Sequence, residues 1–149
     1  MSSYEIRLIP EQPALVPGLS LRMQAIALAR STFPGTRDVT FKVADGIQLV
    51  DCGGNLDHIR CPECGADLQA AWSTAMDAAY DGDRFQDLGW TTPCCDHGTT
   101  LHDLDYDFPM GFARATLAIA DPCRPMPQGF PAKVAGVLGC DLRLIQAND

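Results

Sequence analysis

The chain contains two cysteine-rich segments, Cys61-Pro62-Glu63-Cys64-Gly65 and Pro93-Cys94-Cys95-Asp96-His97-Gly98. Between Cys64 and Cys94 lie 29 residues. Each segment has the proline, glycine and closely spaced donors of a tight turn that directs two soft ligands toward one point. Two such turns supply the four ligands of a tetrahedral zinc ion. The sequence therefore predicts one zinc site that joins two separated parts of the chain.

The first segment resembles the knuckle of zinc-ribbon proteins, in which glycine follows the second cysteine. That glycine removes the Cβ that would clash as the backbone turns its N–H groups toward sulfur. The second segment leaves the fourth ligand open, because Cys94-x-x-His97 repeats the spacing with histidine while the adjacent Cys95 is also a donor. The predicted ligands are Cys61, Cys64, Cys94 and either Cys95 or His97.

The same residues also resemble the signature of zinc nucleoside deaminases, in which Cys or His, any residue and Glu precede Pro-Cys-x-x-Cys. That resemblance implies zinc held by Cys61, Cys94 and His97, with a water in the fourth position and Glu63 as the proton shuttle. The departures are the histidine in place of the second cysteine and a surplus thiol at Cys64. A site closed by four protein ligands explains both, and such a site cannot activate water.

Hydrophobic periodicity and turn residues outline the remaining structure. Strands are predicted over 4–9, 39–43, 47–51, 112–120 and 141–145, and helices over 21–30, 66–80 and 130–138. Ala44-Asp45-Gly46 between two of the strands predicts a hairpin. This order predicts a single α+β domain over residues 1–149, with a mixed β-sheet, helices mainly on one face and the zinc site formed by the two knuckles.

Charge and cysteine content restrict the partners and the compartment. Eight aspartates and one basic residue, Arg84, lie between Asp77 and Asp107, and they account for −7 of the net charge of −8. Such a face repels polyanions, which disfavours nucleic acid. It is either a solvated surface that aids solubility or a docking face for a basic partner. Seven cysteines without a recognisable signal peptide or membrane span predict reduced thiols and the cytoplasm.

The stretch Leu104-Asp105-Tyr106-Asp107-Phe108-Pro109-Met110-Gly111-Phe112-Ala113, taken with the cysteine turns, is similar to stretches in small uncharacterised bacterial proteins. This similarity implies no particular activity. The sequence predicts a non-catalytic, zinc-stabilised domain that binds another protein through its acidic face, as a regulatory or immunity-type module would. The alternative is a zinc hydrolase of deaminase type that uses Glu63.

Overall fold

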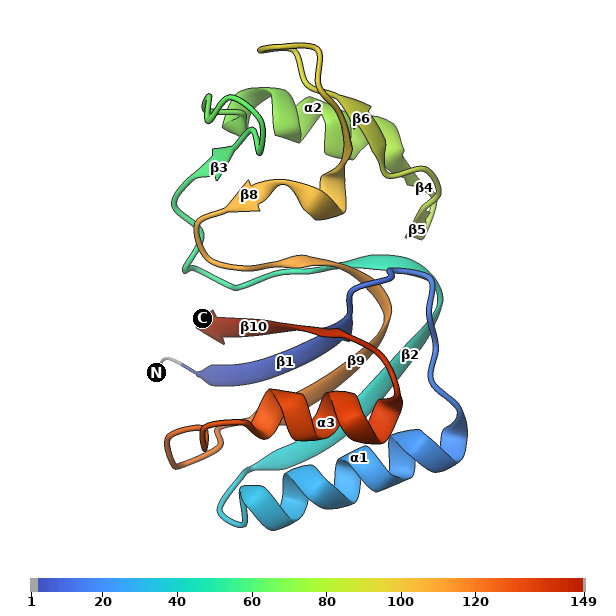
Figure 1. Cartoon of the computed structure of the whole chain (residues 1–149), viewed down its shortest axis with the longest axis vertical. Helices are drawn as coiled ribbons and strands as arrows, with labels where there is room; N and C mark the ends of the chain where they lie inside the picture. Colours follow the sequence, from blue (N-terminus) through green and yellow to red (C-terminus); the bar gives the residue numbers. More distant parts are fainter. Residues whose placement is uncertain (1–2, 149) are drawn as a thin grey trace.

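A six-stranded sheet crosses the middle of the molecule (Figure 1). The computed structural model describes residues 3–148. The strand order is β10-β1-β9-β2-β5-β4. The strands are β1 (Tyr4–Pro10), β2 (Asp38–Val50), β4 (Tyr80–Asp81), β5 (Arg84–Phe85), β9 (Gly111–Ala120) and β10 (Leu142–Asn148). Every neighbouring pair in this sheet is antiparallel. The α+β class is confirmed, whereas the prediction of a mixed sheet is wrong.

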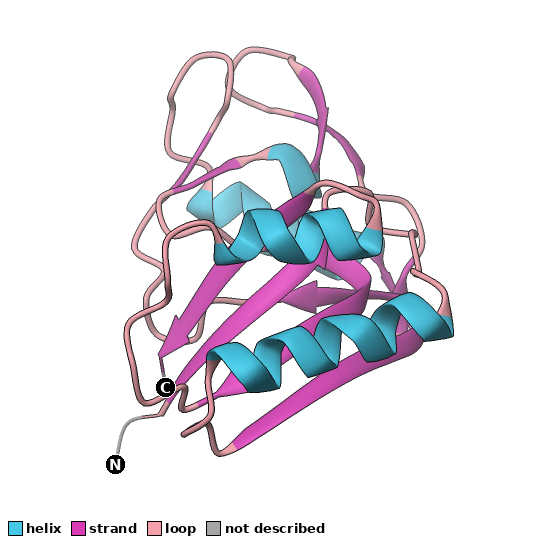
Figure 2. Cartoon of the chain, turned by 60° about the horizontal axis from the view of Figure 1, so that its bottom comes forward, coloured by secondary structure: helices cyan, strands magenta, loops and turns pink. Residues whose placement is uncertain are grey.

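Helices α1 (Leu19–Thr32) and α3 (Phe130–Leu138) lie across one face of the sheet (Figure 2). Ala25 and Ala29 of α1 are fully buried, and their small side chains let the helix approach the strands. The rings of Phe33 and Phe130 meet edge to face with centroids 5.1 Å apart, at the seam between the helices. These residues form the first of two hydrophobic cores.

Residues 51–110, here termed the cap, build a second layer on the opposite side of the sheet (Figure 1). The cap contains β3 (Ile59–Arg60), α2 (Gln69–Ala79), β6 (Gly89–Thr91), β7 (Gly98–Thr100), a 3₁₀ turn (Leu101–Asp103) and β8 (Asp105–Tyr106), as well as the edge strands β4 and β5. Strand β3 pairs with β8, and β6 pairs with β7. The third helix, α2, therefore packs in the second core, away from α1 and α3.

Strand β2 runs without interruption from Asp38 to Val50, so the predicted hairpin at Ala44-Asp45-Gly46 is wrong. Both halves of β2 pair with β9, and the register shifts between Val43 and Gln48. Gly46 of this bulge lies close against Arg84: a Cβ at Gly46 would come within 2.6 Å of the Arg84 Cβ, so a larger residue would clash there. The turn-like residues thus form a β-bulge that bends the strand and leaves the sheet intact.

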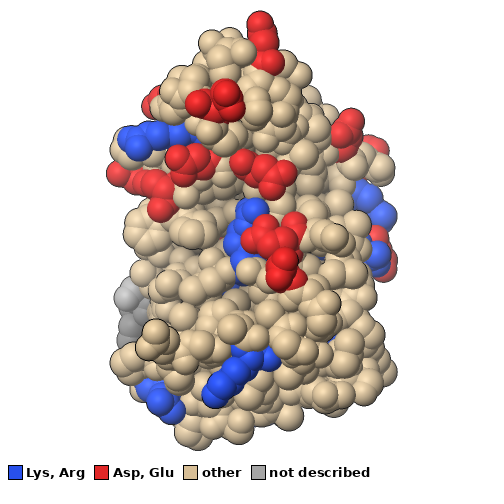
Figure 3. Space-filling model, in the orientation of Figure 1, with Lys and Arg blue, Asp and Glu red and all other residues tan. Residues whose placement is uncertain are grey.

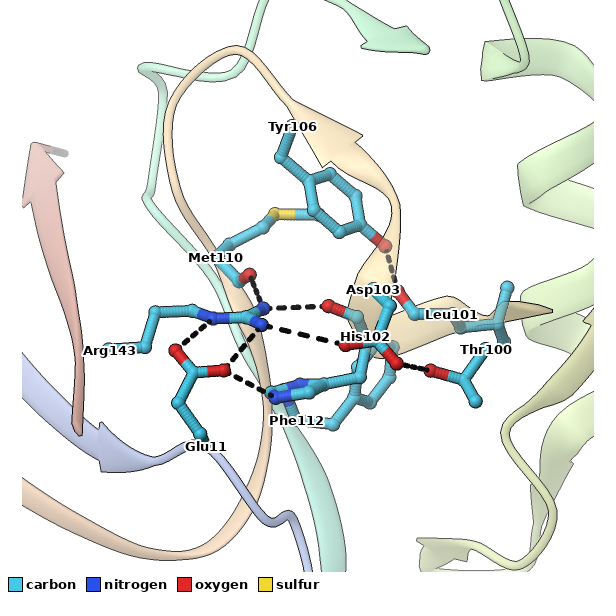
Figure 4. Close-up of polar contacts among 9 residues, drawn as sticks. All are labelled: Glu11, Thr100, Leu101, His102, Asp103, Tyr106, Met110, Phe112 and Arg143. Atoms are coloured by element: carbon cyan, nitrogen blue, oxygen red, sulfur yellow. Dashed lines mark hydrogen bonds and ion pairs between the residues drawn. The ribbon is translucent and has the colours of Figure 1, made fainter. Parts of the chain in front are cut away.

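Arg143 of β10 joins the cap to the sheet (Figure 4). Its guanidinium donates to both carboxylate oxygens of Glu11, at 3.1 and 2.8 Å. It also donates to the main-chain carbonyls of His102 and Met110, at 2.7 and 2.9 Å. Two carbonyls of the cap and one carboxylate beside β1 therefore share a single cation.

His102 is buried beside this guanidinium. Its Nδ1 accepts a hydrogen bond from the backbone N–H of Phe112 at 2.9 Å, and its Nε2 lies 3.7 Å from the Glu11 carboxylate. Burial, followed by the positive charge of Arg143, lowers the pKa of His102 below its usual value. The histidine is therefore neutral at the boundary between the cap and the sheet at neutral pH.

None of the helices within residues 3–148 has the length and apolar character that crossing a membrane requires.

Candidate metal centre

Four cysteine sulfurs of the cap converge on one point. The sulfurs of Cys61, Cys64, Cys94 and Cys95 all lie within 4.8 Å of one another. The Cys64–Cys94, Cys61–Cys95 and Cys94–Cys95 distances are 3.3, 3.7 and 3.9 Å. A tetrahedron with Zn–S bonds of about 2.3 Å has S–S edges of about 3.8 Å. The cluster therefore has the size that a metal ion with four thiolate ligands requires.

The first two sulfurs come from the turn that follows β3. The backbone N–H of Gly65 donates to the Cys61 carbonyl, and the N–H of Cys61 donates to the Ala66 carbonyl, both at 2.9 Å. Gly65 has a φ of +75°, a conformation that a residue with a Cβ adopts only at a cost. This closed turn orients the N–H groups of the residues after Cys61 toward its sulfur.

These backbone donors change the acidity of the two thiols. The N–H of Cys64, together with the N–H of Glu63 and the side chains of Cys94 and Thr92, lowers the pKa of Cys61 to about 6 against the effect of burial. The N–H of Ala66 favours the Cys64 thiolate, but the neighbouring thiols and burial outweigh it and raise the pKa of Cys64 to about 12. A divalent cation would replace the thiol protons.

The second knuckle, at the tip of the β6–β7 hairpin, repeats the first turn in an unexpected register. The N–H of Asp96 donates to the Thr92 carbonyl at 3.0 Å, and the N–H of Thr92 donates to the His97 carbonyl at 2.9 Å. These two bonds match those of the first turn when Thr92 is superposed on Cys61 and His97 on Ala66. Asp96 then takes the place of Gly65 and has a φ of +55°. Cys95 therefore corresponds to Cys64.

This register explains which donors converge. Thr92 occupies the position of the first cysteine and is fully buried, with its hydroxyl 3.8 Å from the Cys61 sulfur and 3.6 Å from the Cys95 sulfur. The fourth sulfur comes instead from Cys94, at the position that Glu63 holds in the first knuckle. The shared proline, Pro62 in one segment and Pro93 in the other, is the sequence signal that would have revealed this alignment.

His97 and Glu63 lie outside the sulfur cluster. His97 falls two residues beyond Cys95, where its carbonyl closes the turn, and its side chain is not among the converging donors. Its Nδ1 is 3.9 Å from a carboxylate oxygen of Glu63, whose side chain is 66% exposed. The ligand set Cys61, Cys94 and His97 implied by the deaminase resemblance is thus not the set that the fold brings together, because Cys64 and Cys95 join Cys61 and Cys94 in the sulfur cluster.

The surface around this centre is acidic, and the charge divides between the two layers. The cap, residues 51–110, carries twelve acidic and two basic residues, whereas the remainder of the chain carries seven acidic and nine basic residues. Figure 3 shows acidic side chains over the upper part of one face and basic ones toward the opposite end. The net charge is therefore −10 for the cap and +2 for the rest.

Comparison with protein-family models, with curated proteins and with solved structures finds no match for this chain.

Proposed function

We propose that this protein is a non-catalytic binding module whose cap folds around Zn²⁺ held by Cys61, Cys64, Cys94 and Cys95, and that the acidic cap binds a basic partner protein. The observation that carries the proposal is the convergence of four sulfurs on one point. Zinc suits four thiolates in a tetrahedral arrangement, and a site closed in this way has no position for a water or a substrate.

The place of the knuckles in the cap supports a stabilising role for the metal. The sulfur cluster connects the segment before α2 to the β6–β7 hairpin, and the cap has only short strands and a helix without a fully buried residue. Elements this short bury too little apolar surface to be stable alone, so metal binding would supply part of their folding free energy. Thiolate ligands also require reduced cysteines, in keeping with a cytoplasmic location.

The acidic cap supports the choice of partner. Its net charge of −10 attracts a basic protein and repels nucleic acid. A regulatory or immunity-type role requires this kind of surface and no catalytic group.

Zinc K-edge X-ray absorption on the purified protein, without added metal, tests the closed site. We expect four sulfur ligands and no oxygen. Three protein ligands with one oxygen would contradict the proposal and would favour a zinc hydrolase in which Glu63 moves protons. In that case Glu63→Gln would abolish ammonia release from nucleosides without loss of zinc.

A matched pair of cysteine variants tests the role of zinc in folding. Cys61→Ser should remove zinc and abolish the cooperative unfolding transition of the cap. Cys123→Ser is the control, because Cys123 is also a free cysteine but lies outside the cluster. A Cys61→Ser protein that lacks zinc and keeps the wild-type melting temperature would contradict the stabilising role.

A further inference from the structure

A groove with a volume of about 910 Å³ separates α2 from strand β6 of the cap. One wall is the face of α2 formed by Ala71, Thr74, Ala75 and Ala78, which recur at helical spacing. Small side chains on this face keep the groove wide and its wall smooth. Thr74 and Ala78 of this face are exposed, whereas Ala71 and Ala75 are half-buried.

The opposite wall is the outer edge of β6. All three residues of β6, Gly89–Thr91, line the groove, and residues 3–148 provide β6 with only one strand partner, β7. Trp90, which is half-buried, contributes apolar surface between the walls. On this edge the N–H of Gly89 donates to the Asp87 carboxylate at 2.8 Å, so an incoming peptide would displace that carboxylate from Gly89 or pair with Thr91. A groove between a helix and an edge strand can receive an extended peptide, which adds a strand through main-chain hydrogen bonds.

The charge of the groove identifies the occupant more closely. Asp81 and Asp87 are the charged residues of its lining, and no Lys or Arg lines it. Its apolar lining includes Ala71, Ala75, Ala78 and Trp90. Because successive residues of a strand point to opposite sides, a complementary segment would alternate apolar residues with Lys or Arg.

The sulfur cluster connects the two walls. Cys64 lies four residues before Leu68, the N-terminal cap of α2, and Cys94 lies three residues after the last residue of β6. Pro93, directly before Cys94, lines one end of the groove. A metal held by both knuckles would therefore set the distance between α2 and β6.

We propose that the groove between α2 and β6 binds an extended segment of a partner protein, in which apolar residues alternate with Lys or Arg, as a third strand on the β6–β7 sheet. This proposal rests on the proposed function, since it locates the partner within the acidic cap. Loss of the metal would separate the walls and abolish the binding.

A peptide selection tests the proposal and does not require the partner protein itself. Random 12-residue peptides displayed on phage are selected on the zinc-loaded protein, and the enriched peptides are synthesised and titrated by fluorescence polarisation. We expect alternating apolar and basic residues, and amide chemical-shift changes along α2 and β6. Ala78→Trp, which fills the groove from an exposed position, should weaken binding at least about tenfold. The matched control is Ala70→Trp, because Ala70 is also exposed on α2 but lies outside the groove; this substitution should leave the affinity unchanged.

Backbone methylation of the selected peptide tests its extended conformation. One set of alternate N-methylations would block the N–H groups that face β6 and abolish binding, while the other set would leave it intact. Two equally damaging sets would contradict strand addition, because alternation is a property of strands alone.

The failures of the two proposals are distinguishable. Enriched basic peptides that bind Ala78→Trp as tightly as the wild type, with shift changes elsewhere on the cap, would refute the groove and retain an acidic binding face. A selection without an enriched peptide would also refute the groove. An oxygen ligand on zinc would refute the closed, non-catalytic site, whatever the peptides do.

Discussion

Replacement of Arg143 by methionine is expected to weaken the contact between the cap and the sheet, which the second hydrophobic core and strands β4 and β5 also hold together. Methionine keeps an apolar stem of similar length, so the change removes chiefly the guanidinium. Four hydrogen bonds are lost: two to the Glu11 carboxylate and two to the carbonyls of His102 and Met110. The hydrogen bonds of Gly54 and Cys52 with Asn148, at the C-terminal end of β10, remain in the variant.

The magnitude follows from the exposure of each partner. Glu11 is 41% exposed, so solvent screens its pair with Arg143 and that half contributes about 1 kcal/mol or less. Arg143 is 18% exposed, and a bond from a charged donor to a partly buried carbonyl contributes about 1.5–3 kcal/mol. Because water will reach the released carbonyls in part, we expect a total loss of about 3 kcal/mol. For a chain of this size, that lowers the melting temperature by about 6–12 °C.

Urea denaturation of the zinc-loaded protein, followed by two signals, measures this loss. Trp72 and Trp90 are the two tryptophans of the chain and both lie in the cap, so fluorescence reports the cap. Far-ultraviolet circular dichroism reports both layers. The wild-type curves should coincide, whereas in Arg143→Met the fluorescence transition should come at lower urea.

Arg37→Met is the control, because Arg37 also forms a close ion pair, with Asp121 at 2.7 Å, but is 65% exposed. Its loss should change the stability little, because solvent screens this exposed ion pair. Glu11→Gln should likewise have a small effect, since Arg143 keeps its bonds to the two carbonyls. An Arg143→Met protein as stable as Arg37→Met, with coincident transitions, would refute the idea that the guanidinium holds the layers together.

Two further predictions concern the metal centre and the buried histidine. Cys95→Ser should lower the zinc content of the purified protein and weaken zinc binding in a chelator competition, while His97→Ala should change neither; the reverse result would make His97 the fourth ligand. The pKa of His102 is lowered in the folded protein, so the unfolded state binds a proton first as the pH falls below about 6.5, the ordinary pKa of histidine. The folded state should therefore lose stability as the pH falls below about 6.5. His102→Asn keeps an acceptor near the Nδ1 position but does not titrate. With both proteins loaded with zinc, the free energy of unfolding of the wild type should exceed that of the variant by less at pH 5.5 than at pH 7.5. A difference independent of pH would contradict the buried neutral histidine beside Arg143.

Local sequence patterns were sufficient for most helices and strands. The predicted helix over 130–138 coincides with α3, and the predicted strand over 112–120 differs from β9 by one residue. These segments bury a continuous apolar pattern, which is encoded within the segment itself. The prediction of a hairpin at Ala44-Asp45-Gly46 was wrong. Both halves of β2 pair with the same strand, β9, so these turn residues form a bulge within one strand. Pairing between distant strands overrides local turn preference.

The sequence by itself determined that two cysteine-bearing turns exist and that they carry thiols able to bind a metal, because a closed turn is made by a few adjacent residues. It left Cys95 and His97 as equal candidates, since spacing alone does not say which residue begins the second turn. The tertiary structure selected Cys95 for the sulfur cluster by placing Thr92 where the first turn has Cys61. The antiparallel order of the sheet, the groove beside α2 and the contact of Arg143 with the cap were likewise decided only in three dimensions. Each of them depends on contacts between residues far apart in the chain, whose register no local pattern specifies.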